Sequence, residues 1–212
     1  MDDTLDILRG LQSLGYDHLI ATPHVYQEYY PNSSGTIRAK LAEVREAATA
    51  AGIDLHLEAS AEYMLDERFR ELMADDDLLP FGKNHILVEL GFLAEPPNVE
   101  DTFFQLRTKG YRPILAHPER YLYLADDLER YARFRELGAL LQVNILSLIG
   151  HYGPEIKKLG WQLIKNDLAD LLGTDCHHTG HIEKLQAALG DRKVQRVLQK
   201  GEWLNGTLTP VE

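Results

Sequence analysis

Six short apolar segments of this 212-residue chain run directly into polar side chains that could bind a metal ion. Most of these side chains are imidazoles and carboxylates, which are common ligands of divalent metals in proteins. Three imidazoles and three carboxylates at one opening would repel one another or be desolvated at high cost, so cations would be needed to compensate them. The residues are His24, Glu62, Glu89, His117, Asn144, Asp175 and His177.

Each of these residues, taken alone, also has an ordinary structural explanation. A histidine at the end of a strand is often held there by hydrogen bonds, and a glutamate is usually solvated. Glu89 closes an otherwise apolar segment, where a metal partner would keep its carboxylate ionised, although it could also protrude at the rim. The metal hypothesis therefore depends on these residues occurring together.

Asp175 and His177 form the most informative local pair, because residues i and i+2 of an extended segment face the same way. Cys176 would then face the opposite side. A cysteine-dependent phosphatase loop needs an arginine six residues after the cysteine, where this chain has Ile182. Since Cys176 is the single cysteine, an intrachain disulfide and a Cys-rich zinc module are also excluded.

Arg120 follows His117 closely and would place a permanent positive charge beside the candidate ligands. The planar guanidinium matches two phosphate oxygens at once, which suits a phosphate-binding residue. The alternative is a surface ion pair with Glu119 or another neighbour. The sequence therefore makes Arg120 the candidate catalytic residue.

A tyrosine-rich stretch, 25–35, is the longest segment without a regular pattern. It could be a mobile surface loop or a loop that contacts the substrate, since loops that follow strands carry specificity in βα folds. Tyr26 from this stretch, Asn144 and His178 are weaker candidates for contacts around the ligands or the substrate.

Apolar runs alternate with amphipathic stretches along the chain, which predicts an α/β fold with helices packed on a parallel sheet. Side chains at the carboxyl ends of parallel strands point into a shared crevice, so the candidate ligands are expected in one polar ring. Strands are expected at 18–22, 54–58, 85–90, 112–117, 139–144 and 169–174. Helices are expected near 3–14, 36–51, 66–74, 99–109, 127–137, 154–166 and 181–199, the last broken near Gly190.

The composition bounds the class of protein. Apolar residues make up 44% of the chain, enough for one core, so a single domain over 1–212 is expected. The net charge of −11 argues against nucleic acid or anionic lipid as the main partner. No stretch resembles a membrane span or a signal peptide, which favours a cytoplasmic protein.

Short motifs along nearly the whole chain resemble the PHP (polymerase and histidinol phosphatase) superfamily. Within it, the resemblance is to bacterial metal-dependent protein tyrosine phosphatases of capsule and exopolysaccharide loci. The motifs share the family's order and spacing, which no single motif could establish. They are ATPH (21–24), SAEYM (60–64), LVEL (87–90), AHPERY (116–121), QVN with SLIGHYG (142–153) and TDCH (174–177).

The resemblance implies a distorted β/α barrel, seven-stranded in the family, that holds up to about three divalent cations, commonly manganese. Arg120 then matches the residue that binds the substrate phosphate, and Glu62 would bridge two of the ions. The matching metal ligands are His24, Glu62, Glu89, His117, Asp175 and His177.

The chain departs from the family pattern at its start. The family opens with a D-x-H-x-H strand and a P-G-x-D-D-G segment, whereas this chain begins where the first helix begins, so two histidines and one aspartate of the metal set are absent. Asp2 and Asp3 fall in the first turn of that helix, where they complement its dipole. We favour Met1 being an internal methionine of a longer protein; otherwise the first strand is missing and the barrel is left open, with exposed edges.

These features predict a phosphate monoester hydrolase that acts on phosphotyrosine in a protein, for example a capsule-locus tyrosine kinase. A small-molecule phosphatase of the histidinol phosphate type is one alternative, and a non-catalytic regulatory homologue that has lost part of the metal site is another. Hydrolysis of C–N bonds on a related barrel is disfavoured, because Arg120 would then lack an obvious anion. The oligomeric state is left open.

Overall fold

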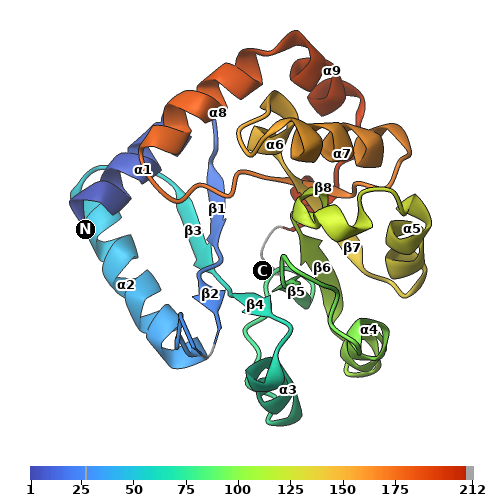
Figure 1. Cartoon of the computed structure of the whole chain (residues 1–212). Helices are drawn as coiled ribbons and strands as arrows, with labels where there is room; N and C mark the ends of the chain where they lie inside the picture. The colour runs from blue at the N-terminus through green and yellow to red at the C-terminus, as the bar shows by residue number, and fades with distance from the viewer. Residues whose placement is uncertain (27, 209–212) are drawn as a thin grey trace.

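A curved sheet of parallel strands lies at the centre of the structure, with helices around its outer side (Figure 1). The computed structural model describes residues 1–26 and 28–208. The strands are β1 (His18–Ala21), β2 (His24–Val25), β3 (His56–Ala59), β4 (Glu62–Met64), β5 (His85–Glu89), β6 (Arg112–Ala116), β7 (Leu140–Asn144) and β8 (Leu171–Gly173). The α-helices are α1 (Asp2–Ser13), α2 (Ser34–Ala50), α3 (Glu67–Ala74), α4 (Val99–Thr108), α5 (Leu128–Glu136), α6 (Ile145–Ile149), α7 (Pro154–Lys165), α8 (Gly180–Gly190) and α9 (Arg192–Lys200). Short 3₁₀ helices are η1 (Pro118–Arg120), η2 (Leu122–Leu124) and η3 (Leu204–Thr207).

The six-stranded sheet has the order β2-β4-β5-β6-β7-β8, and β1 pairs with β3 beside it. β1 and β2 are successive parts of one extended segment that is interrupted at Pro23, which has no backbone N–H to donate. β3 and β4 are likewise interrupted at Ser60. Backbone contacts bridge both interruptions, because Ser60 N donates to Ala21 O at 2.8 Å and Glu62 N donates to Pro23 O at 3.1 Å. The two segments therefore stay paired up to the register partners His24 and Glu62.

The predicted strands and helices are found within about two residues of their predicted positions. The long helix expected over 181–199 is broken after Gly190, since the Asp191 carboxylate accepts hydrogen bonds from Lys193 N and Val194 N at the start of α9. β2, β4 and α6 were not predicted; each has five residues or fewer. The stretch 25–35 is shorter than expected, because Val25 belongs to β2 and α2 begins at Ser34; its residue 27 lies outside the described residues.

The sheet is buried on both faces, as expected for parallel strands that helices cover. Between the sheet and the helices, a large core contains fully buried side chains such as Phe103, Leu115 and Phe134. On the inner side of the curved sheet, Leu87 and Ile114 pack in a smaller cluster that Leu208 also joins. This apolar interior ends at Glu89, the last residue of β5, and at His117, the residue after β6.

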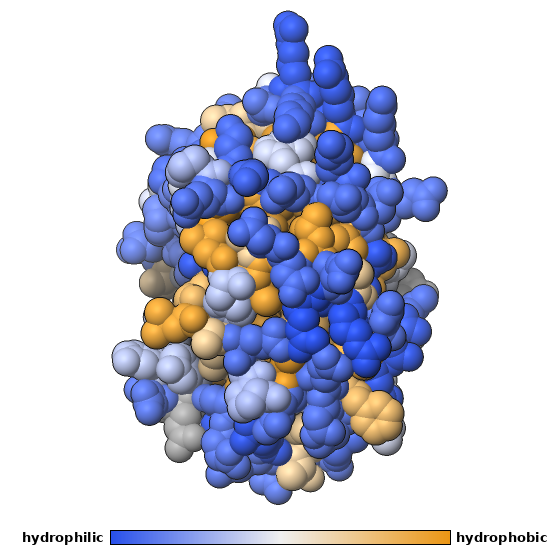
Figure 2. Space-filling model, turned by 45° about the vertical axis from the view of Figure 1, so that its right-hand side comes forward, coloured by the Kyte–Doolittle hydropathy of each residue, from blue (hydrophilic) through white to orange (hydrophobic). Residues whose placement is uncertain are grey.

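Hydrophilic side chains cover most of the face seen in Figure 2, and the hydrophobic residues gather in its middle as separated patches. This agrees with the 26% of charged residues in the chain. None of the helices over the described residues is long and apolar enough to cross a membrane.

Candidate metal and phosphate site

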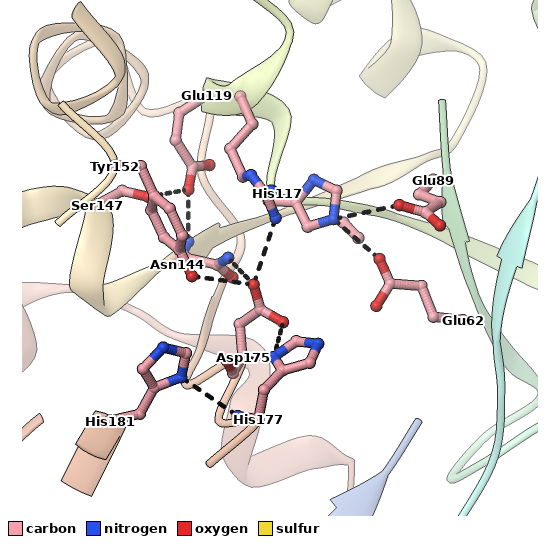
Figure 3. A network of polar contacts seen from close by, with 12 residues as sticks. Glu62, Glu89, His117, Glu119, Asn144, Ser147, Tyr152, Asp175, His177 and His181 are labelled. Carbon is pink, nitrogen blue, oxygen red and sulfur yellow. Dashed lines mark hydrogen bonds and ion pairs between the residues drawn. The ribbon is translucent and has the colours of Figure 1, made fainter. Parts of the chain in front are cut away.

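Four of the predicted ligands meet where β2 and β4 begin, at His24 and Glu62, and where β5 and β6 end, at Glu89 and His117. His117 Nε2 lies 2.9 Å from Glu62 Oε1 and 3.6 Å from Glu89 Oε2 (Figure 3). His24 Nδ1 lies 3.2 Å from Glu89 Oε1. One ligand atom from each of His24, Glu62 and Glu89 lies within 4.8 Å of the other two. We call these residues, with His117, the carboxylate–histidine pocket.

The pocket is shielded from solvent and incompletely paired. The side chains of Glu62 and Glu89 are each 6% exposed and that of His117 is 3% exposed. His24 Nδ1, although 3.2 Å from Glu89 Oε1, is buried without a well-aligned hydrogen bond among the described residues. A buried nitrogen in this state beside two carboxylates is unusual in a folded protein, and a ligand that the protein itself does not supply would satisfy it.

The carboxylates raise the pKa of both histidines. For His24, contact with Glu89 is the main cause, and it outweighs burial, which lowers the pKa. For His117, burial alone would lower the pKa, but the hydrogen bond from its ring to Glu62 and the charge of Glu62 raise it. The pocket therefore favours positive charge, which a divalent cation could supply.

Asp175 gathers a second group of side chains beside the pocket. Its Oδ2 accepts hydrogen bonds from Asn144 Nδ2 at 2.7 Å and from the Tyr152 hydroxyl at 3.3 Å, and lies 3.5 Å from Arg120 Nη1. Its Oδ1 lies 3.3 Å from His177 Nδ1. Figure 3 shows Asp175 between the Asn144 side and the His177 side.

The local reason given for the Asp175–His177 pair was wrong, although the two side chains do meet. β8 ends at Gly173, and Asp175 adopts a left-handed conformation with φ 48°, so the segment is not extended there. His117 also has a left-handed φ, 34°. Residues other than glycine rarely adopt this conformation, and they concentrate at functional sites.

His177 is more exposed than the other candidate ligands, with 54% of its side chain accessible. Its ring centroid lies 6.0 Å from that of His24. The His181 Nδ1 atom accepts a hydrogen bond from His177 N at 3.2 Å and so supports the backbone that carries it. His177 therefore lies at the mouth of the site, between solvent and the pocket.

Arg120 lies between two aromatic rings and does not pair with its neighbour Glu119. Its Cζ atom is 4.6 Å from the ring centroid of Phe92 and 4.8 Å from that of Tyr152. Its side chain is 26% exposed, so the guanidinium is held in place yet can be reached from outside. A cation stacked on aromatic faces keeps N–H donors free at its edge for an anion.

Glu119 was not predicted as a functional residue, but its hydrogen bonds support the backbone that carries Asn144. It is fully buried, and its Oε1 accepts hydrogen bonds from Asn144 N at 3.0 Å and from the Ser147 hydroxyl at 2.6 Å. Burial raises the pKa of its carboxyl group, and the Ser147 hydrogen bond partly opposes this. Glu119 thus fixes the backbone at the end of β7, where Asn144 reaches Asp175.

Phe92 and Tyr152 were also missed. For Phe92 the sequence gives no sign of a role, whereas Tyr152 lies in the SLIGHYG motif, which marks the region but not the contact with Arg120. Of the weaker candidates, Asn144 contacts Asp175. The exposed His178 instead packs against His181, with the two ring centroids 3.9 Å apart. Tyr26 packs 5.1 Å from Tyr29, and Tyr30 is the tyrosine whose ring lies 5.1 Å from His24.

Cys176 was not expected to act as a nucleophile, and its surroundings in the structure agree with this. Its side chain packs against the large core, and burial is the main cause that raises the pKa of its thiol. A thiol with a raised pKa is a poor nucleophile near neutral pH.

The carboxylate–histidine pocket fits a divalent cation. Metal–ligand distances of roughly 2.0–2.2 Å place neighbouring ligand atoms about 3–4 Å apart, comparable with the spacing within this pocket. His24 Nδ1 and His117 Nε2, with the carboxylates of Glu62 and Glu89, supply both kinds of donor. The cation would compensate the charge of Glu62, Glu89 and Asp175.

The model of one protein family matches residues 1–197, and its description is capsular polysaccharide synthesis, CpsB/CapC. A putative tyrosine-protein phosphatase CapC from Staphylococcus aureus is 26% identical over 204 residues, which cover 95% of this chain and 80% of that protein. Tyrosine-protein phosphatase YwqE from Bacillus subtilis is 27% identical over 177 residues, which cover 83% of this chain and 70% of that protein.

A solved structure shares the fold. It belongs to the crystal structures of YwqE from Bacillus subtilis and CpsB from Streptococcus pneumoniae, described as unique metal-dependent tyrosine phosphatases. The match has a TM-score of 0.79 and 24% sequence identity, and it covers 100% of this chain and 92% of that chain. This likeness confirms the α/β fold that the sequence predicted.

Proposed function

Because the chain belongs to the CpsB/CapC family of capsular polysaccharide synthesis, we propose that it is a tyrosine phosphatase, the activity named for its relatives, and that this activity depends on a metal ion. The observation that carries the proposal is the position of Arg120, 3.5 Å from Asp175 and beside the carboxylate–histidine pocket. A phosphate group placed there meets a fixed guanidinium on one side and cation ligands on the other.

The residues proposed to hold the cations are those predicted from the sequence. His24, Glu62, Glu89 and His117 surround the pocket, while Asp175 and His177 lie at its side. Manganese, with up to about three ions, is the proposed content. Bound divalent cations lower the pKa of water, so that hydroxide is available near neutral pH, and they neutralise charge on phosphoryl oxygens.

Arg120 is proposed to bind the substrate phosphate. Two of its N–H donors can bond two phosphoryl oxygens at once, and stacking between Phe92 and Tyr152 limits the conformational freedom lost on binding. Asp175 keeps the guanidinium oriented, and Asn144 and Tyr152 hold Asp175 in turn. Negative charge that develops on the phosphoryl group during hydrolysis is therefore met by a preorganised donor.

Aromatic side chains at the mouth of the site favour an aromatic leaving group. Phe92 is 47% exposed, and its ring lies over His117 at 5.7 Å with an interplanar angle of 28°. Tyr30 is 50% exposed and lies against His24. A phosphotyrosine ring can pack against such surfaces, with its ester oxygen directed to the pocket.

The proposal extends to the substrate and the place of action in the cell. We infer that the substrate is a phosphotyrosine-bearing protein, a capsule-locus tyrosine kinase among the candidates, and that the enzyme acts in the cytoplasm on capsule or exopolysaccharide regulation. The exposed side chains of Phe92, Leu93 and Tyr29 are proposed to contact residues beside the phosphotyrosine.

The experiment compares phosphate release from a phosphotyrosyl peptide and from histidinol phosphate, with Mn²⁺ and after chelation. We expect Mn²⁺-dependent turnover with a clear preference for the peptide. Preference for histidinol phosphate would replace the tyrosine proposal with a small-molecule one. Absence of turnover on both substrates and on an aryl phosphate would favour a non-catalytic homologue.

A further inference from the structure

A second group of metal-type ligands lies at the amino-terminal ends of β1 and β3, away from the site described above. His18 and His56 open these two strands and are direct register partners in the parallel pair. Glu58 follows His56 by two residues and therefore faces the same side of its strand. His18 precedes His24 by six residues, so the two groups are separated by roughly 20 Å of extended chain.

The three side chains converge on one carboxylate oxygen. His18 Nε2 lies 2.6 Å from Glu58 Oε1, and His56 Nε2 lies 3.5 Å from the same oxygen. The two imidazole rings are 4.8 Å apart, centroid to centroid, and are inclined by 69°. The three ligand atoms all lie within 4.8 Å of one another.

Direct hydrogen bonds join only part of this arrangement. His18 Nε2 can donate to Glu58 Oε1 at 2.6 Å, whereas His56 Nε2, at 3.5 Å, is too far from the same oxygen for a good hydrogen bond. If His56 Nε2 carries no proton, its lone pair faces a carboxylate oxygen, which is repulsive. A cation between the three atoms satisfies both nitrogen lone pairs and the carboxylate together.

We propose that His18, His56 and Glu58 form a second metal site that binds a Zn²⁺-type ion, with water completing the coordination. Ligands about 2.1 Å from a tetrahedral Zn²⁺ lie roughly 3.4 Å from one another, so small side-chain rotations close the present spacing. Two imidazoles and one carboxylate favour Zn²⁺ over the oxygen-preferring Mg²⁺ and Ca²⁺. His56 has a 54% exposed side chain, which gives the ion a path from solvent.

The ion would link the two segments that carry His24 and Glu62 of the carboxylate–histidine pocket. β1 continues into β2 with His24, and β3 continues into β4 with Glu62. Because β1 and β3 pair with each other beside the six-stranded sheet, a cross-strand link at their first residues would oppose their separation. The proposed role is therefore structural, and it does not require that the protein hydrolyse phosphate.

The test counts Zn²⁺ equivalents by isothermal titration calorimetry in the wild type, His56→Gln and Glu58→Gln, with Glu46→Gln on the exposed side of α2 as the matched control. We expect each of the first two variants to bind one equivalent fewer than the wild type, and Glu46→Gln to bind the same number. Equal counts in the wild type and in both site variants would overturn the proposal.

Two further readouts keep the result specific. Circular dichroism establishes that each variant is folded, and His56→Gln, at an exposed position, is the safer of the two. The visible spectrum of Co²⁺ added in place of Zn²⁺ should lose one component in both site variants. Metal is counted here without substrate. A failure to find this second site would therefore not affect the phosphatase proposal, and a lack of phosphatase activity would not affect the proposal of this second site.

Discussion

Arg120 is held in place by contacts with one carboxylate and two aromatic rings. Asp175 orients its guanidinium, and the rings of Phe92 and Tyr152 enclose it. Its planar shape allows stacking and two-point donation together, which an ammonium group does not reproduce. The geometry of this residue therefore matters as well as its charge.

Replacing Arg120 by lysine tests that distinction. We expect Arg120→Lys to lower kcat/KM for a phosphotyrosyl peptide by about 10²–10³-fold, as for loss of a preorganised donor to a developing charge. Steady-state kinetics with saturating Mn²⁺ provide the measurement. Arg133→Lys, at a half-exposed position on α5, should remain near wild type; a fully active Arg120→Lys would remove Arg120 from the site.

Phe92 is expected to bind the substrate ring without taking part in bond cleavage. Phe92→Ala should raise KM for a phosphotyrosyl peptide several-fold with a smaller change in kcat, because an aromatic pair contributes about 0.5–1.5 kcal/mol. Phe92→Tyr should restore KM. Phe104→Ala, at an exposed position on α4, is the control. A selective loss of kcat in Phe92→Ala would contradict a role of Phe92 in binding the substrate ring.

At the residue scale, the sequence could predict the metal-type ligands but not the side chains that surround them. His117 and Glu89 were predicted because several ionisable residues follow apolar strand segments in the same chain, although each taken alone has an ordinary structural explanation. Phe92 and Tyr152 contact Arg120 from two separate loops, and such contacts arise only from the folded arrangement. The burial of Glu119 was equally hidden, since an isolated glutamate is usually solvated.

At the element scale, glycines and caps explain why the helices were predictable. Gly52, Gly110 and Gly138 follow helices with positive φ, as a helix-ending glycine should. The short elements escaped prediction because β2 and β4 follow interruptions in their segments, and α6 has only five residues. β2 and β4 nonetheless carry His24 and Glu62, so the carboxylate–histidine pocket depends on elements that the sequence pattern does not reveal.

His85, at the start of β5, makes the stability of this strand depend on pH. Burial, followed by the charge of Arg112, lowers its pKa below the usual 6.5. The unfolded chain therefore takes up a proton first as the pH falls, and stability present above pH 6.5 is lost as the pH falls through the folded-state pKa.

The His85→Gln variant isolates this effect. We expect its free energy of unfolding, measured with urea between pH 7.5 and 5, to fall less than that of the wild type over the acidic part of this range. Titration of the other histidines is common to both proteins and cancels in the difference. Parallel pH profiles for the two proteins would show that His85 does not contribute.

At the scale of the whole molecule, a net charge of −11 coexists with two clusters of candidate metal ligands. The carboxylate–histidine pocket joins residues from β2, β4 and β5, together with His117 after β6. A cation that binds there links four successive segments of the sheet, so it should stabilise the folded chain as a whole.

Metal removal should therefore lower the melting temperature. At a Mn²⁺ concentration about 100-fold above Kd, binding adds about 2.7 kcal/mol, which corresponds to roughly 5–10 °C for a chain of this size. Differential scanning calorimetry with and without chelator provides the measurement. The shift should vanish in Glu62→Gln/Glu89→Gln and persist in Glu46→Gln; the same shift in all three proteins would place the stabilising ion elsewhere.

The measurement closest to the central proposal is the rate of phosphate release from a phosphotyrosyl peptide during a Mn²⁺ titration, for the wild type beside Glu89→Gln. We expect the wild-type rate to rise to saturation with Mn²⁺ and to disappear with chelator, and the Glu89→Gln rate to stay at least about 100-fold lower throughout. An undiminished rate in chelated wild type, or in Glu89→Gln, would contradict a metal-dependent phosphatase built on this pocket.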